Sequence, residues 1–223
     1  MLTDLDLVIF DMAGTTVRDE GQVPRAFSEA LAEYGLATGP DAIRALRGAS
    51  KRQAILDLLP PGADRVALAD RVFDAFRDAL ARGFAAGVHA VDGAPEAFAW
   101  LRERNIRVAL NTGFDRVTTG MLLCALGWTE GRVDAVVCGD DVPRGRPAPY
   151  LVFRCIEAAG VESVRRVMTV GDTVLDLQAG NNAGARYNVG VLSGAHGRQE
   201  LEAQPHTHII GSVADIPGLV SGA

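Results

Sequence analysis

Hydrophobic and polar positions divide the chain into three parts, and the first is a short apolar run. Residues 7–10, Leu-Val-Ile-Phe, are followed by a single carboxylate, Asp11, and then by a turn that contains Gly14. Four apolar residues between polar positions predict a buried strand, with Asp11 at its carboxyl end. Ligands of open parallel sheets bind beyond such ends, where a carboxylate can hold a metal or attack an electrophile. A turn that begins with aspartate and has no chemical role explains this stretch equally well.

The second part, residues 18–86, has apolar residues at helical spacing and no segment that alternates like a strand. Pro24 can begin a first helix, and Gly35 can end it. Further helices are predicted over residues 51–59 and 63–84. This part therefore predicts a small helical bundle inserted after the first strand.

In the third part, from Gly93 onward, strand and helix patterns alternate. Repeated strand–helix units imply a parallel sheet with right-handed crossovers and helices on both faces. The glycine-containing run 180–184 is explained as a helix end rather than a phosphate loop. The predicted strands are 106–110, 133–138, 167–170, 187–191 and a short edge strand at 208–210, and the predicted helices are 95–104, 115–126, 149–159 and 175–183.

Polar residues follow the predicted strands at the points where the strands end. Parallel strands bring these ends to one edge of the sheet, so we expect the polar side chains to lie close together. Any one of them could belong to an ordinary turn, but their coincidence favours a shared site. The residues are Asp11, Thr112, Asp140 or Asp141, and Asp172.

Composition limits the class of protein. The 223 residues are 48% hydrophobic and 22% charged, enough for one large domain or for a domain with an insert. A net charge of -6 argues against a nucleic-acid-binding surface. Three scattered cysteines predict no disulfide framework and fit a reducing compartment. Without a signal-like N-terminus or a long apolar run, we expect a cytoplasmic protein with no membrane contact.

Four short motifs follow one another along the chain: Asp11-Met12-Ala13-Gly14-Thr15, Asn111-Thr112-Gly113, Gly145-Arg146-Pro147-Ala148-Pro149 and Gly171-Asp172-Thr173-Val174-Leu175-Asp176. They resemble the four motifs of the haloacid dehalogenase superfamily of hydrolases. Each motif alone is weak, whereas four in the expected order, with a helical insert after the first, are specific. The resemblance implies an α/β fold whose doubly wound, Rossmann-like parallel sheet comprises residues 1–17 and 87–223. Residues 18–86 would then be a mobile helical cap domain over the active site.

The same resemblance implies roles for residues of these motifs. Asp11 would be the nucleophile that attacks phosphorus and forms an aspartyl phosphate. Thr112 would donate a hydrogen bond to a phosphoryl oxygen. Arg146 would supply the positive charge that lysine usually provides in the superfamily. Without the resemblance, Arg146 would be explained as a surface residue of a proline-rich loop.

The resemblance also implies a Mg²⁺ ion and a set of substrate contacts. The metal would be held by Asp11, the backbone carbonyl of Ala13 and Asp172, with Asp176 close by. The alternative explanation of Asp176 is a charge on a helix surface. The expected substrate-binding residues are Gly14, Thr15, Arg47, Gly113 and Phe114.

Ala13 departs from the commonest pattern of the superfamily. Phosphatases carry a second aspartate there, and general acid catalysis of this kind is worth about 10²–10⁴-fold. Alanine cannot protonate a leaving alkoxide. The run from Asp11 to Thr16 instead resembles the phosphonoacetaldehyde hydrolases, in which this position is also alanine. Those enzymes cleave a carbon–phosphorus bond after a cap lysine forms a Schiff base with the substrate aldehyde.

Lys51 is the candidate for that lysine, because it follows a glycine-led loop, residues 48–50, in the helical block. Neighbouring cations such as Arg52 can make an amine more nucleophilic. The alternatives are a lysine that binds a substrate anion and a plain surface lysine. The resemblance is incomplete, because Ala54 stands where those hydrolases have a histidine and Arg47 where they have a methionine.

Together these patterns predict a Mg²⁺-dependent, phosphonatase-like hydrolase that acts on a small phosphorylated or phosphonate metabolite through an aspartyl phosphate. Phosphonoacetaldehyde, bound as a Schiff base to Lys51, is one substrate consistent with this prediction. The alternatives are a general small-molecule phosphatase and a catalytically weak binding module on the same fold. We expect a monomer or a homodimer. The histidines at 89, 196, 206 and 208 are expected to be structural or exposed.

Overall fold

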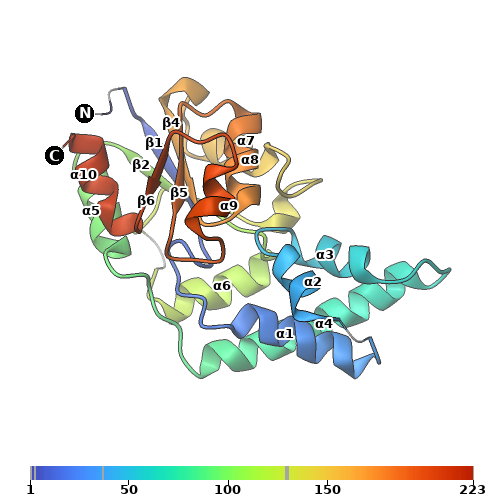
Figure 1. The fold of residues 1–223 in the computed structure, drawn as a ribbon. Coiled ribbons are helices and arrows are strands. Elements are labelled where there is room, and N and C mark those ends of the chain that lie inside the picture. Colours follow the sequence, from blue (N-terminus) through green and yellow to red (C-terminus); the bar gives the residue numbers. More distant parts are fainter. Residues whose placement is uncertain (1, 3, 37, 129–130, 223) are drawn as a thin grey trace.

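The structure is a computed structural model that describes residues 2, 4–36, 38–128 and 131–222. Figure 1 shows a sheet with helices packed against it and, beyond the carboxyl ends of the strands, a separate group of helices that includes α1 to α4. The predicted α/β class with a parallel sheet is confirmed.

In the described part of the chain, six strands form one sheet in the order β3-β2-β1-β4-β5-β6, and every neighbouring pair is parallel. This is the doubly wound order, in which the direction of strand addition reverses between β1 and β4. The strands are β1 (Leu7–Asp11), β2 (Arg107–Asn111), β3 (Ala135–Val137), β4 (Val167–Gly171), β5 (Tyr187–Val191) and β6 (His208–Ile210).

Strand β3 is shorter than the predicted strand over residues 133–138, because only Ala135–Val137 pair with β2. The side chain of Asp134 accepts the backbone N–H of Val108 at 2.8 Å. The N–H of Val108 is thus bonded to a side chain and not to a backbone carbonyl of β3. Side-chain competition of this kind cannot be predicted from apolar patterning.

Successive residues of β1 face opposite sides of the sheet, and both sides are covered. Leu7 and Ile9 pack in one cluster with residues of α7. Val8 and Phe10 pack in a second cluster, in which the rings of Phe10 and Phe98 lie 5.3 Å apart. The covering helices are α7 (Tyr150–Ala158) on the first side and α5 (Ala94–Arg102), α6 (Arg116–Ala125) and α10 (Ile216–Ser221) on the second.

Helix α8 (Val174–Ala183) follows β4 directly, so its first turn lies at the edge of the sheet where Asp11 ends β1. It ends before Gly184, whose φ of +74° terminates the helix, as predicted for the run 180–184. Helices α9 (Arg198–Glu202) and α10 were not predicted, because five or six residues are too few to show helical periodicity.

The residues between β1 and α5 form helices α1 (Gln22–Glu33), α2 (Pro40–Ala45), α3 (Lys51–Leu58) and α4 (Arg65–Ala85). α1 begins before Pro24, and the six-residue α2 was not predicted. The rings of Phe27 and Phe76 hold α1 against α4, with centroids 4.5 Å apart. The two connections to the sheet run side by side, because the N–H of Val91 donates to the carbonyl of Thr16 at 2.9 Å. The division of the chain into two domains stays a prediction.

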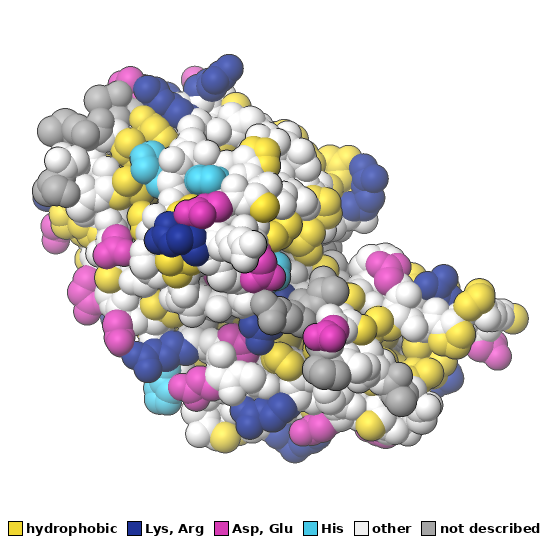
Figure 2. Space-filling model, in the orientation of Figure 1, with side chains coloured by type: hydrophobic (Ala, Val, Ile, Leu, Met, Phe, Trp, Pro, Cys, Tyr) yellow, Lys and Arg dark blue, Asp and Glu magenta, His cyan; other side chains and the backbone are white. Residues whose placement is uncertain are grey.

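Charged residues of both signs are scattered over the face shown in Figure 2, and neither sign forms a large patch on it. No helix among the described residues is both long enough and apolar enough to cross a membrane.

Candidate active site

Three carboxylates meet at the carboxyl edge of the sheet. Asp11 ends β1, Asp172 follows β4 and Asp176 lies in the first turn of α8. Their ligand oxygens lie within 4.8 Å of one another, and all three side chains are buried. β1 and β4 are neighbours at the point where the strand order reverses, which is where doubly wound sheets bind ligands.

Two loops hold the Asp172 carboxylate. The hydroxyl of Thr15 donates to Oδ1 at 3.0 Å, and the backbone N–H of Ala195 donates to Oδ2 at 2.7 Å. A Cβ on Gly14 would lie 2.4 Å from Oδ2, and one on Gly194 would lie 2.0 Å from it, so only glycine allows either loop to approach so closely. The sequence analysis did not predict a role for the loop after β5. Gly194, which lies just beyond a strand that ends at this edge of the sheet, could have indicated it.

The Asp176 carboxylate is held by the capping box that begins α8. Its Oδ2 accepts the backbone N–H of Thr173 at 3.0 Å and also the Thr173 hydroxyl. A Cβ on Gly171 would lie 2.2 Å from the Cβ of Asp176, so glycine at the end of β4 leaves room for this side chain. Asp176 is therefore oriented toward the site instead of lying on the helix surface.

Arg146 links the carboxylates to the helical insert. Its guanidinium lies 2.7 Å from Oδ1 of Asp11 and 2.9 Å from Oδ1 of Asp176, and only 1% of the side chain is exposed. It also donates to the side-chain oxygen of Asn111 and, at 3.2 Å, to the carbonyl of Gly48. A planar group with five donors can make these contacts together, whereas the three donors of an ammonium cannot.

Lys51 begins α3 and reaches the site from the insert. Its backbone N–H donates to the carbonyl of Gly113 at 3.2 Å, and its Nζ donates to the carbonyl of Ala49 at 3.1 Å. A Cβ on Gly113 would lie 2.3 Å from the Ala49 oxygen, so glycine allows the insert to touch the core here. Burial lowers the pKa of Lys51 to about 8, and the nearby Asp11 carboxylate partly offsets this effect.

The remaining predicted residues lie in three places. Thr112 and Phe114 are buried just after β2, where the Thr112 hydroxyl accepts the N–H of Phe114 at 3.1 Å and the Phe114 ring lies near the Lys51 amine. Arg47 instead forms an ion pair with Asp19 at 3.1 Å, near the connection between core and insert. Ala13 lies in the turn just after Asp11.

Residues 5–184 match the family model of haloacid dehalogenase-like hydrolases. The chain belongs to this family. Two similar curated proteins are both named phosphonoacetaldehyde hydrolase. One, from Bacillus cereus, is 31% identical over 208 residues, which cover 86% of this chain and 77% of that protein. The other, from Hahella chejuensis, is 29% identical, with 97% of this chain and 85% of that protein covered.

Solved structures show the same fold as this hydrolase. A hydrolase from Pseudomonas syringae aligns with a TM-score of 0.87 at 23% identity, covering 97% of this chain and 98% of the other. A phosphonoacetaldehyde hydrolase-like protein from Oleispira antarctica aligns with a TM-score of 0.85 at 24% identity, covering 98% of this chain and 92% of the other. At these identities the likeness concerns the fold.

The buried charged side chains that the structure describes in this hydrolase are concentrated in the site. Among the described residues, the buried charged side chains are Asp11, Lys51, Arg146, Asp172 and Asp176, and all of them lie in the site. Burial raises the pKa of Asp11 to about 6, with Arg146 opposing the shift. Burial and the neighbouring carboxylates raise the pKa of Asp172 to about 8.

The same residues fit a divalent metal ion. Three carboxylates outnumber the two buried cations beside them, so a bound divalent cation would relieve their repulsion. Carboxylate oxygens are the ligands that Mg²⁺ prefers, at about 2.0–2.1 Å from the ion, and oxygens within 4.8 Å of one another can share such an ion. Hydrolases of this family generally use a divalent metal, in agreement with this donor set.

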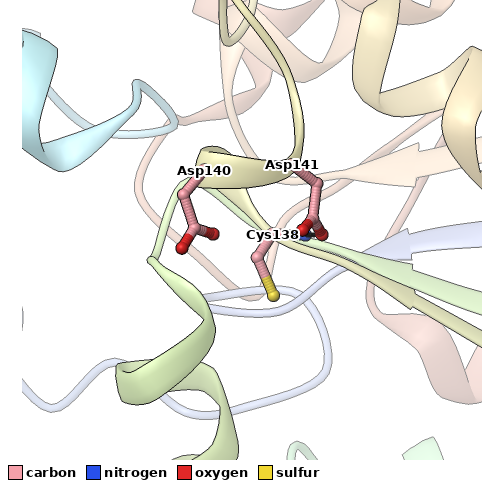
Figure 3. A group of neighbouring side chains, drawn as sticks. All are labelled: Cys138, Asp140 and Asp141. Atoms are coloured by element: carbon pink, nitrogen blue, oxygen red, sulfur yellow. Dashed lines mark hydrogen bonds between the residues drawn. The ribbon is translucent and has the colours of Figure 1, made fainter.

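A second acidic cluster, Cys138, Asp140 and Asp141, lies in the turn after β3 (Figure 3). Its carboxylates serve local structure. Asp140 accepts the backbone N–H of Arg116 at 3.1 Å, and Asp141 accepts the N–H of Cys138 at 2.7 Å and pairs with the Arg116 guanidinium. From the polar residues at the strand ends we expected Asp140 or Asp141 to lie close to Asp172. Both instead bond to the start of α6 or to their own turn.

Proposed function

We propose that this hydrolase is a Mg²⁺-dependent phosphonatase that cleaves the carbon–phosphorus bond of a small phosphonate. In such a substrate the carbonyl carbon is attached to the carbon that is bonded to phosphorus, and phosphonoacetaldehyde is the simplest candidate. One observation carries the proposal: an amine, Lys51, is buried in the same site as the Asp11 carboxylate. The relatives named phosphonoacetaldehyde hydrolase support it.

The identity of residue 51 supports a chemical role for its amine. Lys51 is the single lysine among the 22 lysines and arginines of the sequence. Arginine can hold an anion at least as well, but its guanidinium stays protonated and is a poor nucleophile. Because burial lowers the pKa of Lys51 to about 8, part of the amine is neutral and nucleophilic near neutral pH.

Alanine at position 13 is consistent with a leaving group that needs no protonation by a general acid. Hydrolysis of an alkyl phosphate ester releases an alkoxide, which an acidic side chain two residues after the nucleophile would protonate. A carbon leaving group can instead place its electron pair in a conjugated imine. The absence of a carboxyl group at position 13 is therefore compatible with carbon–phosphorus cleavage.

The proposed reaction uses Lys51 and Asp11 in turn. The neutral amine adds to the carbonyl carbon, and uptake of one proton from solvent with loss of water gives a protonated imine. A carboxylate oxygen of Asp11 then attacks phosphorus, and the electron pair of the breaking carbon–phosphorus bond forms the C=C bond of an enamine. Protonation of the enamine carbon and hydrolysis of the imine release the aldehyde. Water hydrolyses the aspartyl phosphate to regenerate Asp11 and release phosphate.

The remaining residues neutralise charge and exclude water. Mg²⁺ would be held by Asp11, the carbonyl of Ala13 and Asp172, with Asp176 close by, and would offset the negative charge of the phosphonate. Arg146 would add positive charge beside Asp11, and Thr112 would donate to a phosphoryl oxygen. In this proposal residues 18–86 are a cap domain that closes on the core formed by residues 1–17 and 87–223. The loop before Lys51 makes the contact.

A product assay tests this proposal. Incubation with phosphonoacetaldehyde and Mg²⁺ should release phosphate and acetaldehyde in equal amounts, and Asp11→Asn and Lys51→Arg should each abolish the release. Ester substrates should be tested in parallel, because this chain has Ala54 where the phosphonoacetaldehyde hydrolases have a histidine. Mg²⁺-dependent release of phosphate from small esters that survives Lys51→Arg, with phosphonoacetaldehyde left intact, would make this chain a phosphatase.

A further inference from the structure

The ring of Phe114 lies next to the Lys51 amine. Nζ is 5.3 Å from the ring centroid, within the range of a cation–π interaction, and Phe114 is only 2% exposed. We propose that Phe114 is a positioning residue that stabilises the cationic forms of Lys51, the ammonium and the protonated imine, through the face of its ring. The imine part of this proposal rests on the proposed function, whereas the ammonium part does not.

The ring is fixed from several directions. The N–H of Phe114 donates to the Thr112 hydroxyl at 3.1 Å, and its carbonyl accepts the N–H of Gly139 at 2.7 Å. Phe84, at the end of α4, packs edge-on against it with centroids 6.4 Å apart and an interplanar angle of 87°. The position of the ring is thus set by the core and the insert together.

The same core segment also holds the backbone of the lysine. The carbonyl of Gly113 accepts the N–H of Lys51 at 3.2 Å, while the next residue, Phe114, presents its ring to the amine. Residues 113 and 114 therefore fix both ends of Lys51. They hold the amine in the same buried site as the Asp11 carboxylate, which acts on it electrostatically.

The aromatic ring can stabilise the Lys51 cation without accepting its proton, which a carboxylate cannot do. The charged groups around the Lys51 amine are Asp11, Arg146, Asp19 and Asp176. The carboxylates can accept a proton, and Asp11 would lose its charge when it is phosphorylated. The ring face attracts a cation at every stage and cannot take its proton. An imine held over Phe114 would therefore stay protonated, which is the form that withdraws electrons from the carbon–phosphorus bond.

The single lysine gives a direct test. Protein labelled with ¹³C at the lysine ε carbon, with no lysine in any added tag, carries one labelled side chain, and its titration by NMR gives the pKa of Lys51. In Phe114→Leu, which removes the ring face and keeps an apolar side chain, this pKa should fall by about 0.5–1. The kcat for phosphonoacetaldehyde should fall about three- to tenfold. Borohydride trapping at neutral pH should stay at least as fast, because more of the amine is neutral.

Two variants act as controls. Phe114→Tyr keeps the ring and should keep a pKa close to that of the wild type. Phe84→Leu disturbs the packing around Phe114 but leaves its ring, and it should also keep that pKa. If Phe114→Leu does not fold, trifluorophenylalanine at position 114 preserves the shape of the ring, weakens its electrostatic face and should lower the pKa in the same way.

The outcomes separate the two claims. An unchanged Lys51 pKa in both the leucine and the trifluorophenylalanine proteins overturns the proposal, as does an equal fall in Phe84→Leu. Equal losses of trapping rate and kcat in Phe114→Leu would show a merely structural role. If the wild type forms no imine but its Lys51 pKa still depends on the ring, the proposed function fails and the cation–π contact stands.

Discussion

Arg146 shows at the scale of a single residue why arginine and lysine are not equivalent here. Its guanidinium contacts Asp11, Asp176 and the carbonyl of Gly48 at once. Replacement by lysine keeps the charge but leaves some of these buried acceptors without a donor, which costs about 1–3 kcal/mol for each group left unsatisfied.

We therefore expect Arg146→Lys to lower the free energy of unfolding by about 2–3 kcal/mol and kcat/KM by about 10²-fold. Chemical denaturation and steady-state assays check both values. The matched control is Arg116→Lys, because Arg116 pairs with Asp141 while 60% of its side chain is exposed, so little change is expected. Equal behaviour of the two variants would contradict the role given to Arg146.

Residue 13 should decide which kind of bond this site can break. In Ala13→Asp, a carboxyl group two residues after Asp11 could protonate an alkoxide. We expect hydrolysis of a small alkyl phosphate to rise by at least about tenfold, within the usual contribution of general acid catalysis. Cleavage of phosphonoacetaldehyde should not rise, because its leaving group needs no proton at that step. Parallel phosphate-release assays on both substrates measure the difference, and a similar change for both would count against this interpretation.

Lys51 should give the reaction a characteristic pH dependence. Addition to a carbonyl requires the neutral amine, and burial lowers the pKa of this amine from its usual 10.5 to about 8. The neutral fraction, and with it the rate of imine formation, should increase with pH up to about 8 and level off above it. Borohydride trapping at a series of pH values measures this rate. A rate that keeps rising steeply up to pH 10 would show an ordinary exposed lysine.

At the scale of elements, the site depends on how closely the loops approach one another. The loop before α3 lies against Gly113, where a Cβ would come within 2.3 Å of the Ala49 carbonyl. Gly113→Ala should therefore displace this loop, and we expect kcat/KM to fall by about 10²-fold, because small misplacements are costly. Binding of Mg²⁺ should persist, since the carboxylates belong to other elements.

The control for this variant is Gly120→Ala. Gly120 is exposed inside α6 with nothing within 4 Å of an added Cβ, so alanine should raise stability by about 0.5–1 kcal/mol and leave activity unchanged. Assays and isothermal titration with Mg²⁺ distinguish the two positions. Full activity in Gly113→Ala would show that this contact is not needed.

The elements also show what could be predicted from the sequence. Long periodic segments such as α4 and apolar runs such as β1 could be predicted, because the spacing of apolar residues indicates directly which residues are buried. The lone carboxylate at the end of β1 and the Gly-Asp-Thr run that begins at the end of β4 indicated the site, because parallel strands end at one edge of the sheet. Helix α2 and the loop around Ala195 were missed, because they are short and are positioned by tertiary contacts.

The roles of the aspartates after β3 show the limit of this reasoning. Asp140 and Asp141 occupy the same position in the pattern as Asp172, yet they bond to Arg116 and belong to a different cluster. Partners that are distant in sequence decide such cases. The same applies to Arg47, whose pairing with Asp19 could not be predicted from spacing.

For the whole molecule, the crowded carboxylates should couple stability to pH and to metal. The pKa values of Asp11 and Asp172 are raised to about 6 and about 8, so these two carboxyl groups bind protons more tightly in the metal-free fold than in the unfolded chain. The stability that these groups give is present at low pH and is lost as pH rises to about 8. A divalent ion should replace it.

We expect Mg²⁺ to raise the melting temperature more at pH 8 than at pH 6, relative to protein in EDTA. Thermal denaturation under these four conditions measures the effect. Asp172→Asn removes one of the repelling charges, so it should make metal-free protein more stable at pH 8 and abolish the response to Mg²⁺. A shift with Mg²⁺ that is the same at both pH values, or that survives in Asp172→Asn, would place the ion elsewhere.

The most direct test of the central claim is reductive trapping. The protein is mixed with phosphonoacetaldehyde and borohydride, digested, and analysed by mass spectrometry. We expect a reduced adduct on Lys51, the single lysine of the sequence, which is absent from Lys51→Arg. No adduct, together with Mg²⁺-dependent release of phosphate from esters in both proteins, would contradict imine chemistry and leave Lys51 as a residue that binds an anion.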